Sequence, residues 1–306
     1  MTEAILLPGQ GAQFEGMGRD WCEAYETARA TFQEADEILG FALSERCWAG
    51  GEDVHRTDVA QPGIFTTSVA ILRVLQERGL DLAAAPMAAG LSLGEYTALW
   101  CAGALDFADG LRLVRLRGEA MQDASERTPS GMASLMGATP EQAQGLAQVG
   151  ARVGICQVAN LNAPGQIILS GELAALDAAE AVARDHGVRR VRRLKVAGGF
   201  HSECMRPAAD RLAAALTEVL VREPRIQVVS NVSGEPVTGP EQIKEFLARQ
   251  VCSPVLWERS MRWAIEQGHT DFLEPGPGTI LAGILRKIDP EVRVRAAATP
   301  GDLGDV

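Results

Sequence analysis

The pentapeptide Gly90-Leu-Ser-Leu-Gly94 constrains the fold of this chain more than any other feature. It fits the pattern G-x-S-x-G, in which a serine occupies a sharp turn between a strand and a helix. Such a turn crowds its neighbours, so the positions two before and two after the serine need to be almost free of side chain. An apolar segment at 86–90 precedes the turn, and a helix of small residues at 93–101 follows it. We therefore predict an α/β fold with a parallel sheet and with Ser92 at a helix N-terminus.

The flanking sequence extends this pattern in both directions. A short apolar run at 3–8 predicts a first buried strand, and helical periodicity over 19–39 stops at Gly40. Pro62 and Gly79 bracket a second apolar helix. Further along the chain, a helix with Pro207 near its start and a strand at 225–230 continue the α/β alternation.

The middle of the chain predicts a different unit. Its elements follow the order β-α-β-β-α-β, which is the ferredoxin-like pattern. Strands are expected at 131–137, 152–159, 166–171 and 188–197, and helices at 140–149 and 172–186. We therefore expect a large catalytic α/β domain of residues 1–126 and 198–306, interrupted by a small ferredoxin-like domain of residues 127–197.

Composition excludes several classes of function. A net charge of −11 argues against a nucleic-acid partner. No stretch reaches the roughly 20 apolar residues that span a bilayer, and the N-terminus does not have the character of a signal peptide. The cysteines are scattered without a CxxC pair, which is typical of reduced cytosolic thiols rather than a disulfide or zinc framework. They are Cys22, Cys47, Cys101, Cys156, Cys204 and Cys252. We expect a cytoplasmic monomer without a metal site.

A serine nucleophile needs a base, and the chain has only four histidines. His201 follows Gly198-Gly-Phe at the end of an apolar strand and precedes a helix, which is where active-site residues of α/β proteins gather. The other histidines lie in a polar loop, at a helix C-terminus and in a polar connection: His55, His186 and His269. His201 is the best candidate by elimination, and a structural role in the core or a loop is the alternative.

Two arginines follow the serine turn on the next predicted helix. Arg115 and Arg117 are two positions apart, so they do not share a helical face. An arginine buried there would lack a partner unless it met a carboxylate, which could belong to a ligand. A surface salt bridge is the alternative, and these residues alone favour it.

Together these segments resemble the malonyl-CoA:acyl carrier protein transacylase family, over nearly the whole chain. Seven motif matches in the same order carry the resemblance, and the seven together are far more specific than any single match. They are Pro8-Gly-Gln-Gly-Ala-Gln13, Gly90-Leu-Ser-Leu-Gly-Glu-Tyr96, Arg117-Gly-Glu-Ala-Met121, Asn160-Leu-Asn-Ala-Pro-Gly-Gln166, Phe200-His-Ser202, Gln250-Val-Cys-Ser-Pro-Val-Leu-Trp257 and Glu274-Pro-Gly-Pro-Gly278. The family's fold, an α/β-hydrolase-like large domain with a ferredoxin-like insert, agrees with the pattern of predicted elements.

The resemblance implies a role for each matched residue. Ser92 would be the nucleophile, His201 the base, and Gln250 would orient His201 through its backbone carbonyl. Gln10 and the amide of Leu93 would form the oxyanion hole. Substrate binding would fall to Arg117, which clamps the malonyl carboxylate, and to Phe200, Asn160 and Asn162. Leu91 departs from the family, in which many members carry histidine, so the hydrogen bonding of the serine hydroxyl could differ.

The implied activity is transfer of a malonyl group from malonyl-CoA to the phosphopantetheine thiol of acyl carrier protein in fatty acid biosynthesis. The reaction would be ping-pong through a Ser92 ester and would need no cofactor or metal. Three alternatives remain: a trans-acting acyltransferase of a polyketide pathway, a serine esterase or thioesterase, and an inactive docking scaffold. The esterase hypothesis predicts an acidic residue as a third catalytic member, at the end of a strand, and no use for Arg117.

A basic segment near the end of the small domain suggests where the carrier protein binds. Arg189 and Arg190 begin a run of positive charge in an acidic chain, and carrier proteins are generally acidic. A solvated edge strand protected by its charges is the alternative.

Overall fold

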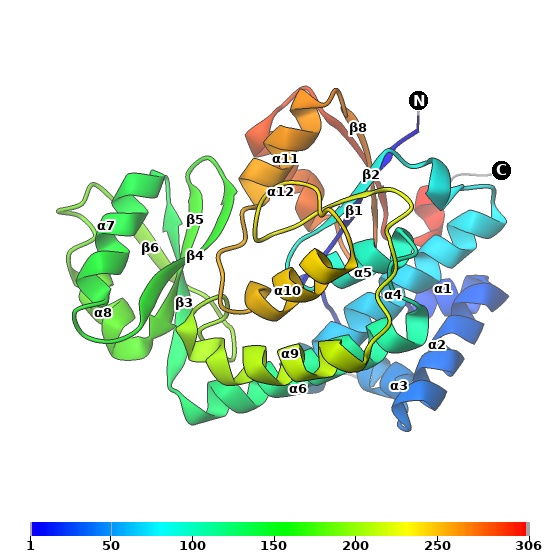
Figure 1. The fold of residues 1–306 in the computed structure, drawn as a ribbon, viewed down its shortest axis with the longest axis horizontal. Coiled ribbons are helices and arrows are strands. Elements are labelled where there is room, and N and C mark those ends of the chain that lie inside the picture. Colours follow the sequence, from blue (N-terminus) through cyan, green and yellow to red (C-terminus); the bar gives the residue numbers. More distant parts are fainter. Residues whose placement is uncertain (1, 50, 304–306) are drawn as a thin grey trace.

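The computed structural model describes residues 2–49 and 51–303, and a parallel sheet of five strands forms its centre (Figure 1). The strand order is β7-β2-β1-β8-β9. The strands are β1 (Ala4–Leu7), β2 (Met87–Gly90), β7 (Gln227–Val229), β8 (Asp271–Pro275) and β9 (Arg293–Ala297). In the register of the central pair Leu7 lies opposite Gly90, so both strands end at the same edge, next to the serine turn.

Helices cover both faces of this sheet, because the side chains of β1 alternate between two cores. Ile5 and Leu7 pack with residues of α4 (Thr57–Glu77), α5 (Gly94–Cys101) and α6 (Phe107–Arg127). Ala4 and Leu6 pack on the other side, with α11 (Trp257–Glu266) and α12 (Ile280–Ile288). Buried apolar strands between two helical layers are typical of a parallel α/β sheet.

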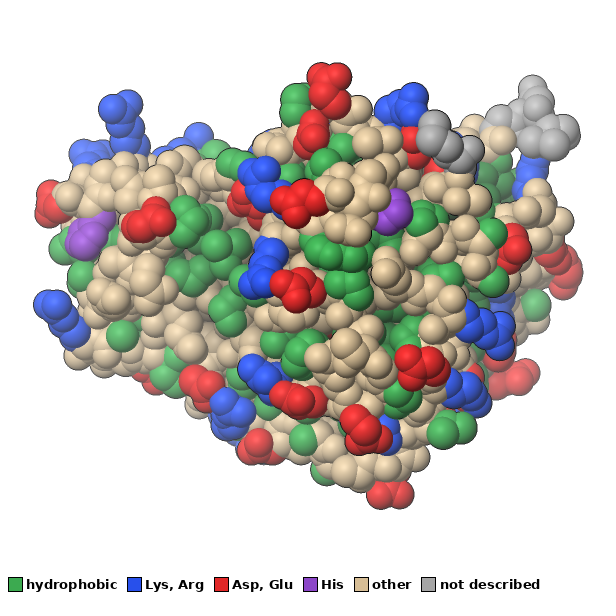
Figure 2. Space-filling view, turned by 45° about the horizontal axis from the view of Figure 1, so that its top comes forward, with side chains coloured by type: hydrophobic (Ala, Val, Ile, Leu, Met, Phe, Trp, Pro, Cys, Tyr) green, Lys and Arg blue, Asp and Glu red, His purple; other side chains and the backbone are tan. Residues whose placement is uncertain are grey.

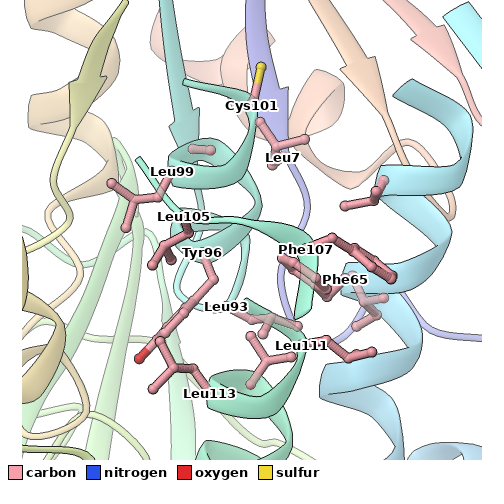
Figure 3. Close-up of a cluster of buried hydrophobic side chains, with 14 of the residues drawn as sticks. Leu7, Phe65, Leu93, Tyr96, Leu99, Cys101, Leu105, Phe107, Leu111 and Leu113 are labelled. Carbon is pink, nitrogen blue, oxygen red and sulfur yellow. The ribbon is translucent and has the colours of Figure 1, made fainter. Parts of the chain in front are cut away.

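The first of these cores surrounds the helix that follows Ser92. Figure 3 shows Leu93, which precedes α5, and Tyr96 of α5 among side chains from the neighbouring helices, including Phe65 and Phe107. The rings of Phe65 and Phe107 are stacked with their centroids 5.8 Å apart. Tyr96 and Leu93 are both fully buried. The turn that carries Ser92 is therefore anchored in tightly packed apolar structure on one side.

A second, antiparallel sheet lies at one end of the molecule (Figure 1). Its strand order is β4-β5-β3-β6, and its helices pack on it through a separate apolar core. The elements are β3 (Ser130–Met136), α7 (Pro140–Gly150), β4 (Cys156–Ala163), β5 (Gln166–Glu172), α8 (Leu173–Ala181) and β6 (Arg190–Arg193). The predicted order β-α-β-β-α-β is confirmed. β4 starts four residues later than predicted, because 151–154 form turns that continue from the end of α7.

The remaining helices complete the covering of the large sheet. They are α1 (Arg19–Ala24), α2 (Glu26–Leu39), α3 (Leu43–Trp48), α9 (Arg206–Glu218) and α10 (Pro240–Gln250). The helix predicted over 19–39 is two helices, because Tyr25 is extended between them. Within the described residues, no helix has the length and hydropathy needed to cross a membrane.

Pro62 does not begin its helix as predicted, but lies inside α4. Proline has no N–H, so the carbonyl of Asp58, four residues earlier, loses its helical donor. The guanidinium of Arg115 donates a hydrogen bond to that carbonyl at 2.6 Å. A side chain from α6 therefore satisfies the buried acceptor, which allows the proline inside the helix.

Candidate active site

Ser92 occupies a strained turn directly after β2. Its φ is 54°, in the left-handed region that non-glycine residues rarely adopt. A Cβ at Gly90 would lie 1.9 Å from the backbone carbon of Gly94, and one at Gly94 would lie 2.2 Å from the Leu7 carbonyl oxygen. Both glycines are therefore required sterically, as the sequence predicts for a nucleophile elbow.

His201 is brought to this turn from another part of the chain. Its Nε2 lies 2.8 Å from the Ser92 hydroxyl, and its Nδ1 lies 2.8 Å from the backbone carbonyl of Gln250. Gln250 is the last residue of α10, so its carbonyl lies at the negative end of the helix dipole. Nδ1–H donating to this carbonyl leaves Nε2 free to accept a proton from the serine. Among the described residues, no carboxylate contacts the His201 ring.

Burial keeps this imidazole neutral. Desolvation, followed by the positive charge of Arg117, lowers the pKa of His201 to about 4. A neutral imidazole at ordinary pH is the form that a general base requires.

Two backbone amides at the serine turn and in the loop that touches it differ from that of Ser92. Among residues 2–49 and 51–303, the amides of Gln10 and Leu93 have no hydrogen-bond acceptor, whereas the Ser92 amide donates to the Asn231 side chain at 2.5 Å. A Cβ at Gly9 would lie 2.0 Å from the Leu91 carbonyl oxygen, so glycine lets the loop before Gln10 touch the elbow. This close approach brings the loop that carries Gln10 against the turn that carries Ser92.

Arg117 lies beside the serine and is almost completely buried, with 1% of its surface exposed. Its guanidinium donates to the Gln61 side chain at 2.8 Å, and to the Ser92 hydroxyl and the Gln250 side chain at 2.9 Å each. Its Nε–H has no acceptor among the described residues. Burial lowers the pKa of Arg117. The site therefore holds a desolvated cation with a spare donor and no carboxylate in contact.

Arg115 has a different environment, as the two-residue spacing predicts. It forms ion pairs with Asp58 at 3.7 Å and with Glu119 at 2.6 Å, and is only half-buried. Gly118 explains why Arg117 instead turns inward, because a Cβ there would lie 2.7 Å from the Thr57 carbonyl oxygen. Glycine thus lets α6 approach α4 closely and brings Arg117 against Gln61.

A cavity of about 920 Å³ opens above the serine, between the two sheets. Ser92, Arg117, His201 and Gln10 line it from the large sheet and its helices, and Phe200 lies beside the base. Asn160 and Asn162 line it from β4, and the buried side-chain oxygen of Asn162 has no hydrogen-bond partner among the described residues. Leu91 also lines the cavity. The Ser92 hydroxyl is hydrogen-bonded to His201 and accepts a hydrogen bond from Arg117. The expected residues therefore meet around one cavity, except for Gln250 and Leu93, which do not line it. Gln250 lies behind the cavity and contacts His201 and Arg117.

Three residues of the site were not identified from the sequence. Gln61 is fully buried and hydrogen-bonds both Arg117 and Gln10. Asn231 holds the elbow, because its side chain also donates to the Gly90 carbonyl at 2.7 Å. Glu95 is a buried carboxylate beneath the turn. A signal existed for Asn231, a polar residue just after an apolar strand, and for Glu95, which belongs to the Gly90–Tyr96 motif.

The arrangement suits covalent acyl transfer: a serine with a neutral base, two free amides and a buried cation for an anionic group. Within the described part of the chain, no three His, Cys, Asp or Glu side chains come together as a metal site would require.

Comparison with known proteins points to the same chemistry. Residues 5–292 match the family model described as acyl transferase domain. The chain is 40% identical over 302 residues to the malonyl CoA-acyl carrier protein transacylase of Bacillus subtilis, which covers 97% of this chain and 93% of that protein.

Solved structures agree in fold. The acyl-carrier-protein S-malonyltransferase of Bartonella henselae superimposes with a TM-score of 0.94 at 36% identity, covering 99% of this chain and 97% of that one. A malonyl-transacylase solved in complex with a type II polyketide acyl-carrier protein gives a TM-score of 0.94 at 36% identity, covering 99% of this chain and 98% of its own.

Proposed function

The chain belongs to the acyl transferase domain family, and we propose that it transfers malonyl groups from malonyl-CoA to acyl carrier protein in fatty acid synthesis. The observation that carries this proposal is the buried guanidinium of Arg117, 2.9 Å from the nucleophile and without a carboxylate in contact. A malonyl thioester carries the carboxylate that this cation lacks. A bidentate pair with that carboxylate would also give an acceptor to the unpartnered Nε–H.

The first half-reaction makes an acyl-enzyme. Ser92 Oγ attacks the thioester carbonyl while His201 Nε2 takes the hydroxyl proton. The amides of Gln10 and Leu93 donate to the negatively charged oxygen of the tetrahedral intermediate. The C–S bond then breaks, coenzyme A takes the proton from His201, and the malonyl group stays on the serine.

The second half-reaction runs the same chemistry in reverse. The phosphopantetheine thiol of the carrier protein gives its proton to His201 and attacks the serine ester, and Ser92 recovers its proton when the C–O bond breaks. Water is the competing nucleophile, so the buried setting of Ser92 and His201 favours transfer over hydrolysis.

Phe200 and the two asparagines complete the proposed substrate site. The Phe200 ring is buried beside the base, where it would occupy the space that an α-methyl group on the malonyl unit needs. Asn160 and Asn162 face the same cavity from β4, and the unpartnered oxygen of Asn162 would accept a hydrogen bond from the pantetheine arm.

The carrier protein is proposed to approach over the basic segment around β6. Arg189 and Arg190 are exposed and make no ion pair within the described residues, whereas nearby Arg193 is paired with Asp177 and Glu180. In Figure 2 lysine and arginine side chains project at the upper left, at the end of the molecule that carries the antiparallel sheet. Unpaired positive charge of this kind would attract an acidic partner.

We further propose that residues 1–126 and 198–306 form an α/β-hydrolase-like domain, and that residues 127–197 form a ferredoxin-like insert. The sheet order β4-β5-β3-β6 with its β-α-β-β-α-β sequence supports the second description. A monomer in the cytoplasm is the expectation from the sequence.

The test is transfer of malonyl from malonyl-CoA to a panel of carrier proteins from fatty acid and polyketide pathways, each with and without phosphopantetheine. We expect transfer only to the forms that carry phosphopantetheine, and fastest to a fatty acid carrier protein. A preference for a polyketide carrier protein would favour the second candidate function, a trans-acting malonyl acyltransferase of a polyketide pathway. The similarity to the malonyl-transacylase solved with a polyketide carrier protein supports this candidate. Hydrolysis without transfer would instead identify an esterase.

A further inference from the structure

Glu95 places a buried carboxylate directly beneath the nucleophile. It lies three positions after Ser92 in the first turn of α5, and only 2% of its surface is exposed. No step of the proposed reaction uses it. Burying a carboxylate is costly unless hydrogen bonds compensate it, so its position calls for an explanation.

The groups around this carboxylate are hydrogen-bond donors. Glu95 accepts from the Gln250 side-chain amide at 2.7 Å and from the Asn231 backbone amide at 3.1 Å. Burial raises the pKa of Glu95, and these hydrogen bonds, with one from Ser230 and the charge of Arg117, oppose that rise. A carboxylate among donors serves as a fixed acceptor that orients them.

The most important of these donors is the side chain of Gln250. Its amide nitrogen donates to Glu95 at 2.7 Å and to the Ser92 carbonyl at 3.0 Å. Its amide oxygen therefore faces Arg117, from which it accepts a hydrogen bond at 2.9 Å. A flipped amide would bring N–H groups against the guanidinium and an oxygen against the carboxylate and the Ser92 carbonyl, so Glu95 and this carbonyl together permit only one orientation.

The amide also keeps the two charges apart. Glu95 in direct contact with Arg117 would occupy the donors that a substrate carboxylate needs. With Gln250 between them, the carboxylate offsets the buried positive charge while the Nε–H of Arg117 stays without an acceptor.

We propose that Glu95 is a positioning residue for malonyl selectivity, which acts through the Gln250 side chain to hold Arg117 in place for the substrate carboxylate. The proposal rests on the proposed malonyl transfer. It assigns two separate tasks to Gln250: the backbone carbonyl orients His201, and the side chain orients Arg117.

The test is kcat/KM of Glu95→Gln for malonyl-CoA and acetyl-CoA, with the Arg117→Ala variant as a second background. We expect the malonyl value to fall about 10- to 100-fold and the acetyl value to fall much less, because glutamine can keep an acceptor for Gln250 but removes the negative charge of that acceptor. In the Arg117→Ala background the same substitution should not lower malonyl transfer further, because the two residues act as a unit.

Glu274→Gln is the matched control. Glu274 is also fully buried, but it belongs to β8, and its carboxylate accepts the N–H groups of Leu281 and Ala282 in the first turn of α12. Its substitution should lower thermal stability without changing the ratio of malonyl to acetyl transfer. Equal losses for both thioesters in Glu95→Gln, or a loss that persists without Arg117, would overturn the proposal.

Gln250→Met keeps the proposal testable if Glu95→Gln does not fold. This variant retains the carbonyl that holds His201 but removes the side-chain link, so it should reproduce the selective loss of malonyl transfer. An unchanged preference for malonyl would refute the inference. Failure of the wild-type enzyme to transfer malonyl would instead refute the proposed function, so the two outcomes are separable.

Discussion

Replacement of Arg117 by alanine should remove the preference for malonyl over acetyl. In the wild type, acetyl-CoA would leave a buried guanidinium without a carboxylate partner, which costs roughly 1–3 kcal/mol and predicts a preference for malonyl of about 5- to 150-fold. Arg117 is 1% exposed, so water cannot replace the missing carboxylate. In the alanine variant the malonyl carboxylate would instead be buried without its cationic partner. Removing one partner of such a buried ion pair costs about 3–5 kcal/mol.

The assay is kcat/KM for both thioesters with one carrier protein, for the wild type and two variants. Arg115→Ala is the control, because Arg115 lies on the same helix but pairs with Asp58 and Glu119 outside the site. Arg115→Ala should leave the ratio of the malonyl to the acetyl kcat/KM unchanged, whereas Arg117→Ala should lower malonyl transfer sharply and acetyl transfer little. If Arg117→Ala keeps the wild-type ratio, the carboxylate clamp is wrong.

Three further predictions follow from the site and its surroundings. Because the pKa of His201 is lowered to about 4, kcat/KM should stay constant as pH falls from neutrality and decline only near pH 4; a decline centred near 6.5 in folded enzyme would contradict this. Phe200→Ser should raise methylmalonyl relative to malonyl transfer, by relieving overpacking of about 1–3 kcal/mol, and leave acetyl poor; an unchanged ratio of kcat/KM values would argue against it. Charge reversal at Arg189 and Arg190 should raise KM for the carrier protein but not for malonyl-CoA; an equal KM at low salt would exclude this docking surface.

The parts of the site that depend on neighbouring residues could be predicted from the sequence. The elbow is a local feature, because the sharp turn at Ser92 leaves no room for a side chain at Gly90 or Gly94, and all three residues lie within five positions. His201 could be selected because the chain has only four histidines. The buried strand predicted directly before it is wrong, because β6 ends at Arg193 and its residues are exposed or half-buried.

The parts that depend on packing between distant elements could not be predicted in this way. Residue patterns favoured a surface role for both arginines, and the contact of α6 with α4 at Gly118 decides that Arg117 turns inward. Gln61 was missed because Pro62 suggested a helix start there, whereas Arg115 satisfies the carbonyl that the proline frees. The partners of Glu95 lie more than 130 positions further along the chain, beyond any local pattern.

The central claim is a covalent malonyl ester on Ser92. Intact-mass measurement after incubation with malonyl-CoA, in the absence of carrier protein, tests it most directly, with Ser92→Ala as the comparison. We expect one malonyl group on the wild-type chain, located on Ser92 by peptide mapping, and none on the variant, because the structure places the only base-paired hydroxyl of the described cavity at Ser92. Equal labelling of the variant, or a label on another residue, would contradict the account.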